Sequence, residues 1–147
     1  MSLAALLLAM AQAVPLVPVE LGEIRMHLFY EHSGQLSDDI SPPRDFAAWN
    51  TVTGGGEAGQ PANDLLIVAE LRTEGQQSIQ SPVRITASNE RGRVLADRRF
   101  PDLFTSEAGR AYAPLWLPDA GCAGRIDVTV KFRIQIRTET LTLNCGE

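Results

Sequence analysis

The sequence contains few of the residues that enzyme chemistry most often uses. It has two histidines and two cysteines in 147 residues. It contains neither a G-x-S-x-G segment nor a C-x-x-C pair. The glycine run at 54–56 is not followed by Lys and Ser or Thr, as a phosphate-binding loop would require. These absences argue against serine hydrolases, dithiol oxidoreductases and P-loop nucleotide-binding proteins.

The two histidines, His27 and His32, are five positions apart with Glu31 between them. This spacing fits neither the i, i+4 pair of a helix nor the i, i+2 pair of a strand, so the two rings would not point to one metal ion. Ser33 follows His32, but adjacent residues of an extended chain point in opposite directions. We expect surface histidines without a catalytic role. A small enzyme or metal-dependent module using this region remains an alternative.

Basic residues are outnumbered, and the formal net charge is −5. An acidic chain is a poor partner for nucleic acid or for an anionic membrane. The charge is uneven, however. Between Glu31 and Asp64 there are six acidic residues and one basic residue, Arg44, whereas the segment from Arg84 to Arg99 has five arginines and two acidic residues. The sequence therefore predicts an acidic end and a basic ribbon.

No apolar run reaches the roughly 20 residues that a membrane-spanning helix needs, so no span is expected. Residues 1–13 are uncharged and apolar, and they end in Ala-Gln-Ala, a pattern that signal peptidase recognises. We expect a signal peptide at 1–13, a single mature domain at 14–147, and export to the periplasm or the cell exterior. The alternative is that residues 3–13 form an N-terminal core helix of a cytosolic protein.

Alternation of apolar and polar residues predicts β-strands along most of the chain, and the continuous apolar run at 65–72 predicts a central strand buried on both faces. The segments are residues 21–30, 65–72, 83–88, 93–100, 111–117, 125–134 and 136–147. Pro114 restricts its segment to an edge or a bulge, and the turn at 89–92 has glycine where a positive φ is expected. About seven short strands with Gly- and Pro-rich turns indicate an all-β, immunoglobulin- or fibronectin-like β-sandwich. No named family is recognised.

The long connection at 31–64 is rich in turn-forming residues. Within it, Phe46 and Trp49 at i, i+3 predict one short helix that opens at Pro43 or Asp45. The loop is acidic and much longer than most connections, and we expect it to be the contact surface for a partner. The residues of this possible binding loop are Asp38, Asp39, Asp45, Trp49 and Glu57.

Cys122 and Cys145 are equally distant from the expected turn near 133–135, so a hairpin there would bring them opposite each other. In an exported protein, such a pair is expected to form a disulfide. Asp38, Asp39, Asn63 and Asp64 offer oxygen ligands at the two ends of the long loop, which makes them candidates for calcium. The competing interpretation is that these residues form turns.

The two tryptophans could form a platform for a sugar ring, but we expect packing roles for both. Trp116 lies between two leucines, which favours the core, and Trp49 is grouped with Phe46. The sequence predicts an exported, non-catalytic binding module with a protein partner and no cofactor. Alternatives are a calcium-dependent or carbohydrate-binding module, a small periplasmic enzyme, and an accessory subunit whose edge strand pairs with a partner chain.

Overall fold

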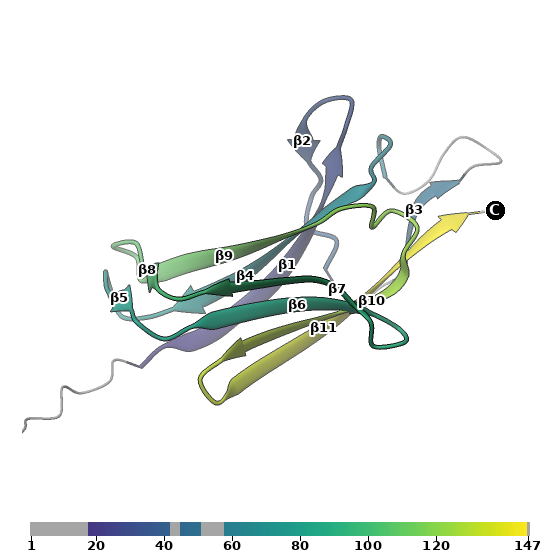
Figure 1. The fold of residues 1–147 in the computed structure, drawn as a ribbon. Coiled ribbons are helices and arrows are strands. Elements are labelled where there is room, and N and C mark those ends of the chain that lie inside the picture. Colours follow the sequence, from purple (N-terminus) through teal and green to yellow (C-terminus); the bar gives the residue numbers. More distant parts are fainter. Residues whose placement is uncertain (1–17, 42–44, 51–57, 147) are drawn as a thin grey trace, which may run out of the picture.

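A computed structural model describes residues 18–41, 45–50 and 58–146, with the backbone alone at 45–50 and 145–146. The predicted signal peptide at 1–13 and Glu57 lie outside these residues. The described chain is all-β, with no helix in it, and its sheets are almost entirely antiparallel (Figure 1).

Two sheets contain nearly all of the strands. The first, sheet A, has the order β2 (Gln35–Leu36), β1 (Glu20–Tyr30), β4 (Asp64–Arg72), β9 (Arg110–Leu117). The second, sheet B, has the order β3 (Asp45–Asn50), β11 (Gln135–Gly146), β10 (Gly124–Phe132), β6 (Val83–Asn89), β7 (Val94–Phe100). A short ribbon of β5 (Ser78–Ile79) and β8 (Leu103–Phe104) lies at one end.

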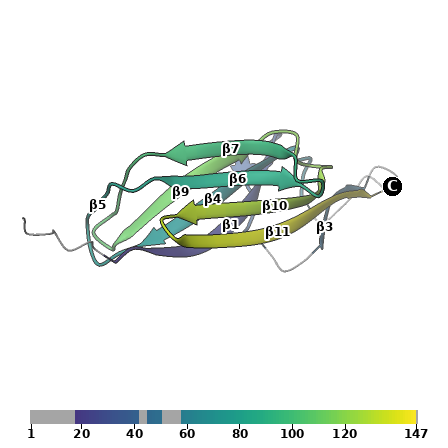
Figure 2. The same cartoon turned by 60° about the horizontal axis from the view of Figure 1, so that its bottom comes forward.

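Sheets A and B lie over each other, as Figure 2 shows, and the buried residues of both sheets form one hydrophobic core. Alternate residues of each strand face the core because side chains of a β-strand alternate between its two sides. Met26 and Ile67 from sheet A and Val128 and Phe132 from sheet B are completely or almost completely buried. No helix in the described residues is long and apolar enough to cross a membrane.

The two predicted hairpins are confirmed. β6 and β7 are joined by a turn in which Gly92 has φ 74°, the left-handed conformation that glycine adopts without strain. β10 and β11 pair from Gly124 opposite Leu143 down to Phe132 opposite Gln135, which leaves a two-residue turn. This register is centred where the cysteine spacing predicted it, between residues 133 and 134.

The register continues toward Cys122 and Cys145, which lie just beyond the Gly124–Leu143 pair on their respective arms. Cys122 itself is in the turn before β10, where Ala123 N–H donates to Ala120 O. The side chain of Cys145 is outside the described residues, so the disulfide stays a prediction.

The helix predicted around Phe46 and Trp49 is wrong, because residues 45–50 form β3, a strand parallel to the end of β11. Two aromatics three positions apart are weak evidence for a helix, and a six-residue helix gains little from its own hydrogen bonds. Pairing with the exposed edge of β11 satisfies the backbone instead. The segment 31–64 therefore contributes β2 and β3 to the sheets and is only partly a loop.

The start of β1 is fastened to the start of β11 by side chains. Gln135 accepts from Leu21 N–H at 2.9 Å and donates to Val19 O at 2.7 Å. Arg137 donates to Gly22 O. These bonds join sheet A to sheet B at one side of the core, between positions more than 110 residues apart.

Candidate functional site

The calcium candidates are divided between two places. Asp39 Oδ1 accepts from the N–H groups of Met26, at 3.0 Å, and Ser41, at 2.9 Å. Burial raises the pKa of Asp39, but these two N–H groups, together with the Ser41 side chain and the nearby His27, outweigh that effect and hold the pKa below its ordinary value. This carboxylate thus caps the backbone at the edge of β1. Asp38 is exposed beside it.

Asn63 and Asp64 have other partners. Asn63 Nδ2 donates to Glu31 Oε1 at 2.7 Å, and Asp64 accepts from Trp116 Nε1 at 2.8 Å and from Asp119 N–H at 3.1 Å. Asp64 lies opposite Phe29, three positions along β1 from the Met26 to which Asp39 is bonded. Within the described residues, no three His, Cys, Asp or Glu side chains come together as metal ligands.

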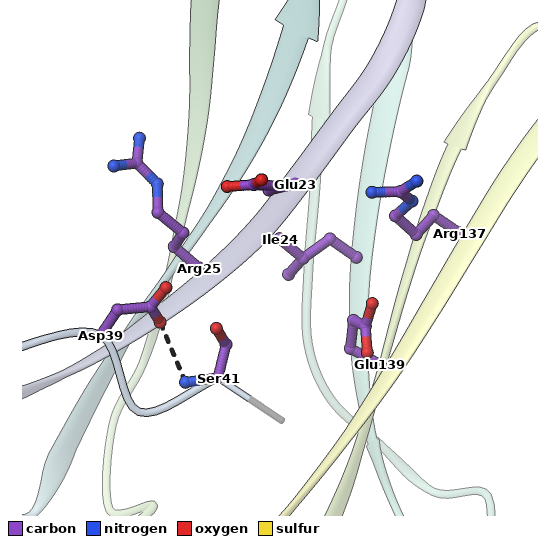
Figure 3. Close-up of a pocket in the computed structure, with 7 residues that line it drawn as sticks. All are labelled: Glu23, Ile24, Arg25, Asp39, Ser41, Arg137 and Glu139. Carbon is purple, nitrogen blue, oxygen red and sulfur yellow. Dashed lines mark hydrogen bonds between the residues drawn. The ribbon is translucent and has the colours of Figure 1, made fainter. Parts of the chain in front are cut away.

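A pocket of about 200 Å³ opens where β1, residues 39–41 and β11 meet. Figure 3 shows Arg137 and Glu139 of β11 across from Asp39 and Ser41, with Ile24 between them. Glu23 and Arg25 complete the lining. The described lining combines carboxylates, from Glu23, Asp39 and Glu139, with the guanidinium groups of Arg25 and Arg137.

The two histidines do not form a comparable site. His27 Nδ1 lies 2.9 Å from Ser37 O on the outer side of β1, and His32 is exposed in the turn that follows. Among the other predicted binding-loop residues, Asp45 and Trp49 are in β3, where only the backbone is described.

The largest departure from the sequence prediction is Trp116. Its side chain is 41% exposed on the outer side of sheet A, because the core-facing residues of β9 are its neighbours Leu115 and Leu117. The expectation of a core tryptophan is therefore wrong. In a strand, a residue between two buried leucines faces the opposite side. The alternation of residues in the segment AYAPLWL is consistent with an outward-facing Trp116.

Trp116 is held in place from two directions. Asp64 accepts the indole N–H, and the ring of Phe29 meets the indole edge-to-face at a centroid distance of 5.3 Å. Leu66 lies beside it on β4, with His27 next in the same row on β1. The indole is thus both ordered and accessible, a combination that reduces the entropy lost on binding.

Further along β9, Tyr112 is 44% exposed, and the guanidinium of Arg25 lies 5.2 Å from its ring centroid. Val68 and Pro114 lie side by side between the two exposed aromatics. We call this outer surface of sheet A the aromatic face. It comprises Phe29, Leu66, Val68, Tyr112, Pro114 and Trp116.

One end of the aromatic face is bounded by a buried carboxylate. Glu70 is 3% exposed and accepts from Arg72 Nη2 at 2.6 Å and Arg110 Nη1 at 2.7 Å. Burial raises the pKa of Glu70, but hydrogen bonds and the two guanidinium charges outweigh burial and lower the pKa overall. Both arginines are about half exposed, so they present cationic groups beside Tyr112.

Comparison with known proteins gives no further assignment. No protein-family model matches the chain, and none of the curated proteins matches it.

Proposed function

We propose that this chain is an exported, non-catalytic β-sandwich module that binds a protein partner through the aromatic face. The observation that carries the proposal is the pair of exposed aromatics on β9, Trp116 and Tyr112, each held by a neighbouring side chain. Export rests on the sequence pattern at 1–13.

The immunoglobulin-like part of the proposal is supported by the strand order. Omitting β2 and β3, the sheets run β1-β4-β9 and β11-β10-β6-β7. Lettered in chain order, these are A-B-E and G-F-C-C′, an order that resembles immunoglobulin-like sandwiches, in which A, B and E share one sheet and C, F and G the other. The parallel strand β3 beside β11 extends the second sheet after the chain has crossed over from the first.

A protein partner is favoured by the residue types on the surface. Protein interfaces are enriched in Trp, Tyr, Phe and Arg and depleted in Lys and Glu, and Trp, Tyr and Arg contribute most of the binding energy. The aromatic face combines Trp116 and Tyr112 with the guanidinium of Arg25, and it contains no lysine. Arg72 and Arg110 lie at its rim.

A carbohydrate ligand is the second candidate, supported by the ordered indole of Trp116 on a sheet face. An aromatic ring held in this way offers a surface on which an apolar sugar face can stack. Under this alternative Trp116 would dominate binding, and the guanidinium groups near Tyr112 would matter less.

The test combines export and binding. The purified mature protein is used to capture partners from a periplasmic extract, beside Trp116→Ala and Tyr112→Ala. The matched control is Thr138→Ala, a residue on the outer side of sheet B. Both aromatics are partly exposed, so their removal should leave the fold intact.

We expect a protein that the parent and Thr138→Ala retain, and that both aromatic variants bind at least tenfold more weakly. Binding at equal strength by all four proteins would exclude the aromatic face as the contact. Retention of a glycan instead, lost only in Trp116→Ala, would favour the carbohydrate alternative.

A further inference from the structure

The turn between β10 and β11 presents two isoleucines to solvent. Ile134 is 97% exposed at the turn itself, and Ile136 is 64% exposed on the outer side of β11. These are the two most exposed aliphatic side chains among the large exposed hydrophobic residues of the described chain. An isoleucine that is almost fully exposed gains none of the free energy that burial of its apolar surface would give, unless another molecule covers it.

The turn residue next to them is in an unfavourable conformation. Arg133 has φ 53°, in the region where two-residue hairpins normally place Gly, Asn or Asp. Its guanidinium donates to Ser81 Oγ at 3.1 Å and lies 4.9 Å from the ring centroid of Phe132. Glycine would adopt this φ without strain, so the arginine at position 133 indicates a role beyond closing the hairpin.

Cationic side chains lie beside the isoleucines in one row across sheet B. Ile136 is opposite Lys131, Lys131 is opposite Arg84, and Arg84 is opposite Arg99. Arg84 is paired with Asp97. Within the described residues, neither Lys131 nor Arg99 forms an ion pair. We call this surface the basic hairpin tip, comprising Arg84, Arg99, Lys131, Arg133, Ile134 and Ile136.

The net charge of −5 belongs to the whole chain and does not give the local charge at the basic hairpin tip. Glu31, Asp38 and Asp39 follow the far end of β1, whereas the hairpin tip adjoins its beginning through the Gln135–Leu21 hydrogen bond. Figure 1 shows this separation, with the β10–β11 turn and β2 at opposite ends. At physiological salt, charges more than about 8 Å apart are largely screened, so these distant carboxylates contribute little to the potential at the tip. The carboxylates on the strands next to it include Glu20, at the start of β1, and Asp97, which is paired with Arg84.

We propose that the basic hairpin tip docks on an anionic lipid surface. Ile134 and Ile136 enter the boundary between headgroups and acyl chains, while Lys131, Arg133 and Arg99 contact lipid phosphates. Exposed aliphatic groups combined with basic residues characterise elements that bind at a membrane surface. The contact is peripheral and independent of the aromatic face, which lies on the other sheet and stays available to a partner.

The test is sedimentation with vesicles of phosphatidylcholine alone or with about 30% phosphatidylglycerol, whose charge attracts basic residues. We expect the parent protein to bind only the anionic vesicles. Ile134→Asp should weaken binding at least tenfold, and Lys131→Glu about fivefold or more, since one cation near such a surface contributes about that factor. Binding should weaken further at high salt. Soluble glycerol phosphate should not displace the protein, because it offers no acyl boundary.

The matched control is Leu36→Asp, which changes an exposed aliphatic residue of β2 at the opposite end and should bind like the parent. All variants are first compared by circular dichroism. Failure of the parent to bind anionic vesicles overturns the proposal. Loss of binding in Lys131→Glu but not in Ile134→Asp overturns it as well, because the tip would then bind polyanions in general. Trp116→Ala should bind vesicles normally, so failure of the aromatic-face proposal would leave this result unchanged.

Discussion

Glu70 fills the space that a side chain at Gly22 would need. A Cβ built on Gly22 would lie 2.5 Å from Glu70 Oε2 and 3.0 Å from Glu70 Cβ. The pairing of β1 with β4 shifts register between Leu21 and Ile24, around this glycine. The glycine therefore allows the buried carboxylate to lie against the irregular start of β1 and to accept from Glu23 N–H.

Gly22→Ala should consequently destabilise the protein, by about 1–3 kcal/mol, because either Glu70 or the strand must move. Urea denaturation measures the change. The control is Gly59→Ala, since nothing lies within 4 Å of a Cβ built on Gly59 and its φ is not in the left-handed region. We expect the control to change stability by less than about 0.5 kcal/mol. Equal effects would show that Glu70 is not the cause.

Stability should depend on the ionisation of Glu70. Its pKa is lowered in the folded protein from an ordinary value of 4.5, so its contribution is complete above that value and is lost as the pH falls through the lower, folded pKa. Glu70→Gln should therefore lower Tm at neutral pH and flatten its decline in acid. Part of the decline of Tm in acid should remain in Glu70→Gln, because the pKa values of Asp39, Asp97 and Asp127 are also lowered. Calorimetry at a series of pH values tests this, with the exposed Glu74→Gln as the charge-matched control. Parallel Tm curves for the parent and Glu70→Gln would contradict it.

Replacing Arg133 by glycine should stabilise the protein by about 1 kcal/mol, because glycine adopts the positive φ of this turn without strain. Arg133→Ala is the control that removes the side chain but keeps the strain, and it should give no gain. Thermal unfolding distinguishes the two. If both variants were stabilised equally, the destabilisation would come from the arginine side chain and not from the backbone conformation.

Cys122 and Cys145 should form a disulfide in the native protein. Closing a loop of this length stabilises a fold by about 3 kcal/mol in the chain-entropy description. The double replacement by serine should lower the free energy of unfolding by that amount and leave the circular dichroism spectrum unchanged. Thiol titration without reductant should find no reactive group, and titration of two thiols would refute the bond.

Expression of the full chain in a Gram-negative host should yield a periplasmic protein that begins at Val14. N-terminal sequencing identifies the cleavage site. Ala13→Glu should retain the leader, since signal peptidase requires a small residue there. Recovery of the uncleaved parent from the cytosol would show that residues 1–13 are not a signal peptide.

The strands with a local apolar pattern were predictable from the sequence. Most show alternation, β4 is a continuous apolar run, and β1, β4, β6, β7, β9 and the β10–β11 hairpin agree with the predicted segments to within a few residues. β3 was not predictable in this way. Its structure depends on the edge of β11, almost 100 positions later, and no local pattern at 45–50 reports that pairing.

The candidate sites were less accessible to sequence reasoning. The direction of Trp116 followed from strand alternation, but its partner Asp64 is 52 positions away and comes next to it only through the pairing of β4 with β9. The row of cations beside Ile136 is assembled from three strands, β10, β6 and β7. The arginine-rich segment at 84–99 indicated a basic ribbon, but its juxtaposition with exposed isoleucines required the register of sheet B.

The pairing of β3 with β11 also constrains the order in which the protein can fold. Residues 45–50 pair with residues 142–146, almost 100 positions later, and β1 is fastened to Gln135. Contacts between distant positions form slowly, because a long loop must close before they contribute any stability. A chain that emerges from its N-terminus cannot complete sheet B until its last strand is available. Under the proposed export, this delay would leave sheet B incomplete until β11 has crossed the membrane.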